Sequence, residues 1–159
     1  MFTRSSNNWK TKSGGWDALH TELIDFDTDY PILSSILQVT DFNLVMCNNY
    51  KSINDSSLIS TFVDDYLLER YWNNPLKYIT FYNKAKYVMS PDYSLLIGMP
   101  KPMQKWNVYR NRFVGYVWQK SGMNVIPTIS WSNESSFDYC FKGVELGSTV
   151  AVSNIGCRN

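Results

Sequence analysis

The sequence predicts an α/β domain with a mostly parallel sheet of about five strands and intervening helices, in an open-sheet or partial-barrel arrangement. Short apolar runs recur along the chain, and each run ends in small polar or acidic residues. Helix-like sequence separates several of these runs, which is typical of successive βα units that run the same way. Ligands of such sheets usually bind at the carboxyl ends of the strands. The pattern therefore predicts both a fold and the place on it where a site would lie.

The five expected strands share an apolar, partly β-branched composition and a polar end, and they span residues 42–47, 58–63, 87–89, 124–129 and 149–152. Pro127 lies inside the fourth run. Because proline donates no backbone hydrogen bond, it indicates an edge strand, a bulge or an irregular segment that faces a site.

The expected helices follow from apolar side chains three and four residues apart. After the second strand, helical spacing begins in DDYLLERYW, and Pro75 is well placed to begin another helix. The longest helix is expected over residues 103–121, with Gly122 as its stop. Shorter helical segments are expected over residues 17–24 and 135–141.

Length and composition indicate one domain over residues 16–159, preceded by a polar arm over residues 1–15. The chain has 159 residues, of which 44% are hydrophobic and 16% aromatic, so these side chains need a core or a partner. The formal net charge of +1 excludes the global field of a strong nucleic-acid binder.

Cysteine usage and apolar run lengths indicate an intracellular, soluble protein. There are three cysteines and no C-x-x-C pair, which favours a reducing compartment over a disulfide framework. The N-terminal residues lack the apolar core of a secretory signal, and no run approaches the roughly 18 apolar residues of a membrane span.

Several long segments of the sequence resemble one protein family. They are DDYLLERYWNNP, MSPDYSLLIGMPKPMQKWNVYRNR, NVIPTISW, SFDYCFKG and STVAVSNIG, which together span residues 63–156. These words are similar to domain of unknown function 4417, a family of bacteriophages, plasmids and other mobile elements. The resemblance implies a phage or mobile-element origin, the cytoplasm of a bacterial host and a short member that lacks the usual C-terminal extension. It implies no reaction.

Three carboxylates at the strand ends are the candidate catalytic residues: Asp64, Asp65 and Asp92. If the second and third strands are neighbours, these side chains converge. They would then hold Mg²⁺ for phosphoryl-transfer chemistry, or supply a general acid if one pKa is raised. The alternative is structural, since aspartate at these positions also caps helices and closes turns.

The long helix carries the candidate ligand-binding residues Gln104, Asn107, Arg110, Asn111 and Arg112. An arginine beside amide side chains can bind phosphate or carboxylate through bidentate hydrogen bonds. The alternatives are a solvated helix face, or an Arg110 that pairs structurally with an aspartate at the strand ends.

Two residues at later strand ends complete the candidate ligand site, namely Trp131 and Ser153. Trp131 would stack on a base or a sugar, or else pack as a lid over the sheet end. Trp106 and Trp118, on the long helix, are expected in the core.

The sequence does not show the residue patterns of several other well-known catalytic and metal sites. His20 is the only histidine and lies outside the segments of the βα pattern. This disfavours a catalytic site with a serine or cysteine nucleophile and a histidine base, and it disfavours a closed zinc site. Asp25, Asp27 and Asp29 alternate as in a calcium loop, but Tyr30 replaces its glycine and Ile36 its glutamate. No phosphate-binding glycine loop occurs.

Three functions remain open from the sequence. The first is a binding protein that acts on a host or replication component, and the second is an enzyme for a phosphorylated or nucleotide-like ligand, with Mg²⁺ as its cation. The third, ranked last, is a nucleic-acid-binding accessory protein that uses the arginines and the basic arm. The last strand would be covered by the N-terminal arm, or it would pair with another subunit of a homo-oligomer.

Overall fold

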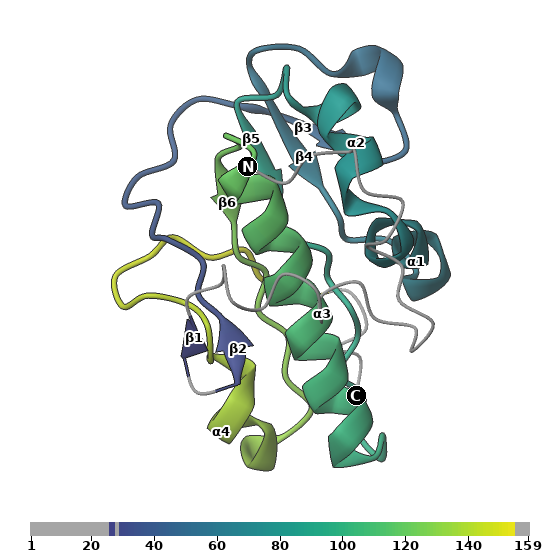
Figure 1. Cartoon of the computed structure of the whole chain (residues 1–159), viewed down its shortest axis with the longest axis vertical. Helices are drawn as coiled ribbons and strands as arrows, with labels where there is room; N and C mark the ends of the chain where they lie inside the picture. The colour runs from purple at the N-terminus through teal and green to yellow at the C-terminus, as the bar shows by residue number, and fades with distance from the viewer. Residues whose placement is uncertain (1–25, 28, 155–159) are drawn as a thin grey trace.

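The structure is a computed structural model that describes residues 26, 27 and 29–154. Its centre is a four-stranded sheet of β3 (Asn43–Met46), β4 (Ser57–Ser60), β5 (Tyr87–Met89) and β6 (Val125–Ile126). The strands lie in that order and every neighbouring pair is parallel. The sheet is open (Figure 1), so the predicted α/β class is confirmed. The expected arm over residues 1–15 and helix over residues 17–24 lie outside the described residues.

The fifth expected strand makes a single parallel bridge, Thr128 to Ala151, beyond the end of β6. The amide of Ala151 donates to the carbonyl of Pro127 (2.8 Å), and the amide of Ile129 donates to the carbonyl of Ala151 (3.0 Å). The β5–β6 ladder stops at Ile126, one residue before Pro127, which has no amide proton to donate. The fourth and fifth runs thus form an irregular edge.

Three helices pack on one face of the sheet (Figure 1): α1 (Asp65–Asn73), α2 (Pro75–Tyr82) and α3 (Lys101–Lys120). Pro75 occupies the first turn of α2, and the side chain of Asn74 accepts the amide of Lys77 there. Gly122 has φ +91° just after α3, which is the left-handed conformation that ends a helix without strain in glycine. The predicted start of α2 and the predicted stop of α3 therefore follow from local sequence, whereas α3 begins at Lys101, two residues before the predicted start.

The two faces of the sheet are covered differently. On the helix side, Ile59, Val88 and Val125 pack into a core that includes Phe113 and Trp118. On the other side the sheet contributes Leu58, Tyr87, Met89 and Ile126, which pack against side chains from extended segments and loops, namely Ile36, Val39, Phe62 and Ala151. No helix covers this second face in the described part of the chain.

Small elements surround the lower half of α3 (Figure 1). β1 (Phe26–Asp27) and β2 (Tyr30–Pro31) form an antiparallel pair. The 3₁₀ helix η4 (Glu134–Ser136) leads into the short helix α4 (Phe137–Cys140), where a short helix or turn is expected from the sequence. Another 3₁₀ helix, η3 (Tyr50–Ser52), follows β3 and lies elsewhere, with Tyr50 against α2. Among the described helices, none is both long and apolar enough to cross a membrane.

Candidate functional site

Two of the three candidate carboxylates lie together at the strand ends. Asp65, in the first turn of α1, accepts hydrogen bonds from the Oγ atom (2.8 Å) and the amide (3.1 Å) of Ser94. Asp92 accepts one from Ser130 Oγ at 2.6 Å, which joins the segments that follow β5 and β6. Asp64 occupies the capping position of α1, but its exposed side chain makes no capping hydrogen bond.

Burial raises the pKa of Asp92 above the usual value of an aspartate. The hydrogen bond from Ser130 acts in the opposite direction, and the nearby charge of Asp65 raises the pKa further. Asp65 and Asp92 are therefore electrostatic neighbours. Within residues 26, 27 and 29–154, no group of three or more histidine, cysteine, aspartate or glutamate side chains is arranged to hold a metal ion.

All five candidate ligand-binding residues of α3 are buried: Gln104, Asn107, Arg110, Asn111 and Arg112. The alternative of a solvated helix face is therefore excluded for these five residues. Most hydrogen bonds of these side chains go to the segments that follow β5 and β6. Those of Arg110 go to Glu69 on α1 and to Asn107 on α3 itself.

Arg112 is fully enclosed by oxygen acceptors. Its Nε donates to the carbonyl of Lys142 (2.8 Å), Nη2 donates to the carbonyl of Cys140 (2.7 Å), and Nη1 donates to the carbonyl of Thr128 (3.0 Å) and to Asn111 Oδ1 (2.6 Å). Burial lowers the pKa of Arg112 to about 10, so the side chain still carries its charge at neutral pH. An anion would have to displace these acceptors to reach the guanidinium.

Arg110 is engaged by a carboxylate, an amide and a ring. Its Nη1 donates to Glu69 Oε1 (2.5 Å), and Nη2 donates to Asn107 Oδ1 (2.7 Å). The guanidinium carbon lies 3.9 Å from the centroid of the Tyr93 ring. The expected structural pairing is thus present, but its partner is Glu69 on α1 and not an aspartate at the strand ends.

The amide side chains of Gln104 and Asn111 fasten loops to α3. Asn111 Nδ2 donates to the carbonyl of Pro91 (2.8 Å) and to Thr128 Oγ1 (2.6 Å). Gln104 Oε1 accepts from Ser132 Oγ and from the Tyr139 hydroxyl, both at 2.8 Å. Because buried polar groups are costly when unpaired, this network fixes the segments that follow β5 and β6.

The cavity at this network is very small. It has a volume of about 10 Å³ and is lined by residues that include Asn111, Arg112, Thr128 and Ser130. That volume is about the smallest that holds one water molecule. Trp131 stands at the surface beside the network with 43% of its area exposed, and Ser153 is half-buried two residues beyond Ala151.

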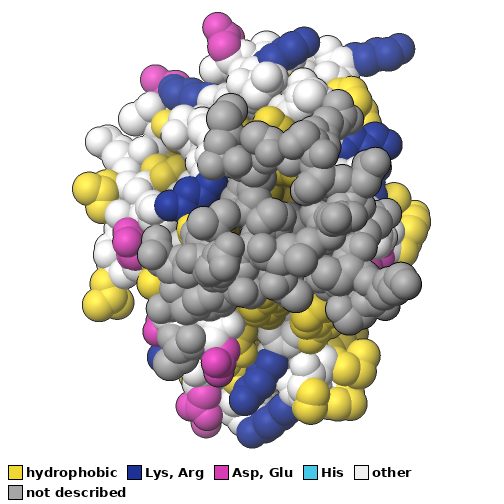
Figure 2. All heavy atoms as spheres, viewed as in Figure 1, with side chains coloured by type: hydrophobic (Ala, Val, Ile, Leu, Met, Phe, Trp, Pro, Cys, Tyr) yellow, Lys and Arg dark blue, Asp and Glu magenta, His cyan; other side chains and the backbone are white. Residues whose placement is uncertain are grey.

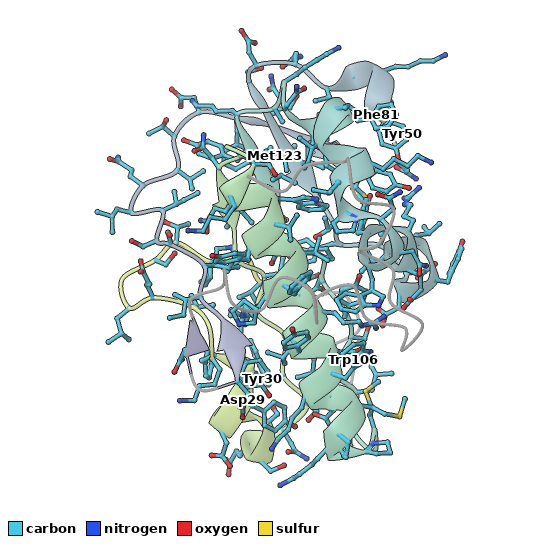
Figure 3. All side chains as sticks on the ribbon, viewed as in Figure 1. Asp29, Tyr30, Tyr50, Phe81, Trp106 and Met123 are labelled. Carbon is cyan, nitrogen blue, oxygen red and sulfur yellow. The ribbon has the colours of Figure 1, made fainter. Side chains whose placement is uncertain are left out.

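A larger groove lies between α3, β2 and α4, with a volume of about 510 Å³. Its described lining is aromatic and charged, and consists of Asp29, Tyr30, Pro102, Lys105, Trp106, Tyr109, Asp138, Tyr139 and Lys142. In Figure 3, Asp29 and Tyr30 lie to one side of the lower half of α3 and Trp106 to the other. Figure 2 shows hydrophobic, basic and acidic side chains side by side at this end of the molecule.

Trp106 behaves differently from Trp118. Trp118 is fully buried in the core, as expected. Trp106 packs edge-on against Trp72 (5.0 Å) and lies nearly parallel to Tyr109 (5.8 Å, 10°), yet 44% of its area is exposed. The core assignment of Trp106 is therefore only half correct, because one side of its indole borders the groove.

The sequence offered no local signal for this groove. Its walls come from residues 29–30, 102–109 and 138–142, which only the tertiary fold brings together. The one available hint was the aromatic share of 16%, since such side chains need either a core or a partner.

Comparison with known proteins places the chain among phage proteins. The model of the family described as domain of unknown function (DUF4417) matches residues 29–159. The Gene 1 protein of Mycobacterium phage L5 is 37% identical over 165 residues, which cover 99% of this chain and 71% of that protein. The Gene 1 protein of Mycobacterium phage D29 is 32% identical over 170 residues, which cover 99% of this chain and 60% of that protein. No solved structure matches significantly.

Proposed function

The chain belongs to the DUF4417 family, and from that premise we propose that it is a phage binding protein that engages a host or replication component through the groove between α3, β2 and α4. The observation that carries the proposal is the contrast between two concave places. The groove holds about 510 Å³, whereas the cavity at the strand-end network holds about 10 Å³. Of the groove and the small cavity, only the groove therefore has room for a ligand larger than a water molecule.

The lining of the groove has the composition of a protein-recognition surface. Tyrosine and tryptophan are enriched at binding hot spots because they bury large areas with few rotatable bonds. Tyr30 and Tyr139 line the groove and are buried, and both belong to a packed cluster that includes Val108 of α3. Trp106 stands partly exposed at the wall and is held by Trp72 and Tyr109. The surface is thus preformed, which lowers the entropic cost of binding.

The test is affinity capture of the full chain from bacteria that carry its parent phage, with captured proteins quantified by mass spectrometry. Trp106→Ala removes the exposed aromatic wall and should lower the yield of the specific partner at least about tenfold, as for a hot-spot residue. Phe81→Ala is the matched control, because Phe81 is 42% exposed and lies at the opposite end of the molecule (Figure 3). Thermal unfolding of both variants checks that the fold is retained.

The proposal fails if Trp106→Ala captures the partner as well as the unaltered chain. It also fails if Phe81→Ala loses the partner and Trp106→Ala keeps it, since recognition would then lie at the α2 end.

One observation favours an enzyme as the second candidate. Asp92 has a raised pKa and lies near Asp65 at the sheet end, which suits a proton donor for a phosphorylated or nucleotide-like ligand. Arg110 and Arg112 would have to leave their present acceptors to bind its phosphate. If this candidate is right, Asp92→Asn folds normally and loses a ligand or Mg²⁺ that native mass spectrometry detects on the unaltered chain.

A further inference from the structure

We propose that Arg70, on α1, anchors a second binding site, separate from the groove, which takes an oxyanion in the form of the phosphate or carboxylate group of a ligand. The site is no part of the proposed function, because Arg70 does not line the groove. Its guanidinium group lies among tyrosine rings and finds no hydrogen-bond acceptor on any residue that the structure describes.

Two guanidinium nitrogens of Arg70, Nε and Nη2, are buried without a hydrogen bond. No ion pair joins Arg70 to any described residue. The carboxylates of its own helix are engaged elsewhere, since Glu69 binds Arg110 and Asp65 binds Ser94. Because a buried donor costs free energy when it is unpaired, the guanidinium is stabilised by an acceptor that reaches it.

Arg110 shows which contact Arg70 lacks. The guanidinium of Arg110 lies over a tyrosine ring, and both of its Nη atoms donate, one of them to Glu69, so that only its Nε is unpaired. Arg70 has the aromatic part alone, with its guanidinium carbon 5.1 Å from the ring centroid of Tyr71 and 6.0 Å from that of Tyr78. A phosphate or carboxylate group supplies the missing acceptor through charge-assisted, bidentate hydrogen bonds.

Tyrosine hydroxyls near Arg70 are further donors for the same ligand. Burial raises the pKa of Tyr78, the charge of Tyr50 raises it further and the charge of Arg70 lowers it, so these groups lie within electrostatic reach of one another. The hydroxyls of Tyr71 and Tyr82 bind each other at 2.6 Å. Those of Tyr50 and Tyr78 form no hydrogen bond with a residue in the described part of the chain, so they are free to donate to an oxyanion.

The surroundings of Arg70 suit a ligand with an apolar or aromatic part. The Tyr50 ring lies 5.1 Å from that of Phe81, which is 42% exposed, and Figure 3 shows the two together at the upper end of the molecule. A second cation, Lys77 Nζ, lies 5.9 Å from the centroid of the Tyr78 ring that Arg70 also approaches. Its positive charge adds to the attraction for an anion.

Arg70 is free to turn toward a ligand. The residue is half-buried, and its side chain has no hydrogen bond to a described residue that such a movement would break. Arg112 is the opposite case, since an anion would have to displace its carbonyl acceptors. Among the described arginines, Arg70 is therefore the one that an incoming oxyanion engages at least cost.

The test follows the Nε–H signal of Arg70 in ¹⁵N-resolved spectra of the full chain, assigned by its loss in Arg70→Met. Burial of Nε slows exchange of this proton with water and keeps the signal visible near neutral pH. The probes are phenyl phosphate, benzoate and the neutral benzyl alcohol, in phosphate-free buffer. At least one anion should move the signal at millimolar concentration, and benzyl alcohol should not. The tighter of the two anions tells a phosphate ligand from a carboxylate ligand, and its affinity should fall as salt is added.

Variants place the anion at Arg70, with affinities measured by ligand-observed titration. Arg70→Lys keeps the charge but loses the planar fork, so it should weaken the tighter anion about tenfold. Lys105→Gln is the matched control, because Lys105 Nζ also lies close to a tyrosine ring, 5.8 Å from the centroid of Tyr139, but in the groove. This control should leave the affinity within about twofold.

Thermal unfolding without ligand separates a binding arginine from a structural one. Arg70→Met keeps an apolar stem and removes the unpaired donors, so the midpoint of unfolding should stay the same or rise. A guanidinium with structural partners would lower the midpoint when it is removed.

Oxyanion recognition is overturned if neither anion moves the Arg70 signal, which would mean that water alone meets these nitrogens. It is equally overturned if Lys105→Gln weakens the anion as much as Arg70→Lys does, or if Arg70→Met lowers the midpoint by more than about 5 °C. None of these results decides the proposed function, because Trp106 lies at the other end of the molecule from Tyr50 (Figure 3) and partner capture by Trp106→Ala does not involve Arg70.

Discussion

At the scale of the residue, Asp92 is held in an environment that favours its neutral form. Burial and the charge of Asp65 outweigh the opposing hydrogen bond from Ser130, so its pKa in the folded state exceeds the usual value near 3.9. The folded protein therefore binds the proton of Asp92 more tightly than the unfolded chain does. The resulting contribution to stability is complete below the unfolded pKa and is lost as the pH rises through the folded pKa.

Asp92→Asn removes this titration and keeps an oxygen that can accept the hydrogen bond from Ser130. The free energy of unfolding of the variant, relative to the unaltered chain, should rise as the pH increases from about 4 and then level off above the folded pKa. Urea unfolding between pH 4 and pH 8 measures the difference. A difference that stays constant or falls with pH would contradict the raised pKa, and Asp55→Asn controls for the loss of an exposed charge.

At the scale of the element, the loop after α4 is fixed to β2 by a close backbone approach at Gly143. Its φ is +71°, and a Cβ atom there would lie 2.3 Å from the carbonyl oxygen of Pro31. The amide of Leu33 donates to the carbonyl of Gly143 at 2.9 Å, and Arg112 binds the carbonyl of the preceding Lys142. This contact places Asp138 and Lys142 against Asp29 and so builds one end of the groove.

Gly143→Ala combines a left-handed backbone with a steric clash, so it should lower the free energy of unfolding by more than about 2 kcal/mol. Gly147→Ala is the matched control, because Gly147 has φ +81° but open space around its Cβ position. That variant should lose only about 1 kcal/mol. Urea unfolding measures both, and equal losses would mean that the approach to Pro31 is not tight in solution.

At the scale of the whole molecule, an extended segment after β2 ties distant parts of the fold together. Leu33 is fully buried in the helix-side core, with its Cδ atoms about 3.1 Å from the Cβ position of Gly115 on α3. The amide of Ser35 donates to Glu145 Oε2 (2.7 Å), and Ile36 accepts the amide of Thr149 (2.7 Å). One short segment thus joins α3 to the C-terminal part of the described chain.

Leu33→Ala should therefore lower the free energy of unfolding by about 2–5 kcal/mol, through lost burial and a residual cavity beside Gly115. Leu37→Ala, at a position 77% exposed in the same segment, should stay within about 0.5 kcal/mol. Denaturant unfolding gives both values. If Leu33→Ala lowered the free energy of unfolding as little as Leu37→Ala does, the segment would not be a stabilising part of the core.

The sequence by itself determined the elements whose causes are local. Apolar runs with polar ends marked the positions of β3 to β6 and predicted that these strands run mostly parallel, and Pro75 and Gly122 marked where helices begin and end. It also grouped Asn107, Arg110 and Asn111 on one stretch of helix. The convergence of Asp65 and Asp92 followed only on the condition that the second and third expected strands are neighbours. Hydrophobic periodicity and backbone restrictions act over a few residues, so a single sequence is enough to recognise them.

Only the tertiary structure decided which way those groups face. Asn111 and Arg112 turn inward because the segments after β5 and β6 supply the oxygens that satisfy them, and helical spacing alone does not say which face is covered. The fifth strand shrank to one bridge at the irregular edge beside Pro127. The groove joins residues more than a hundred positions apart, such as Asp29 and Asp138, and no local pattern encodes such a contact.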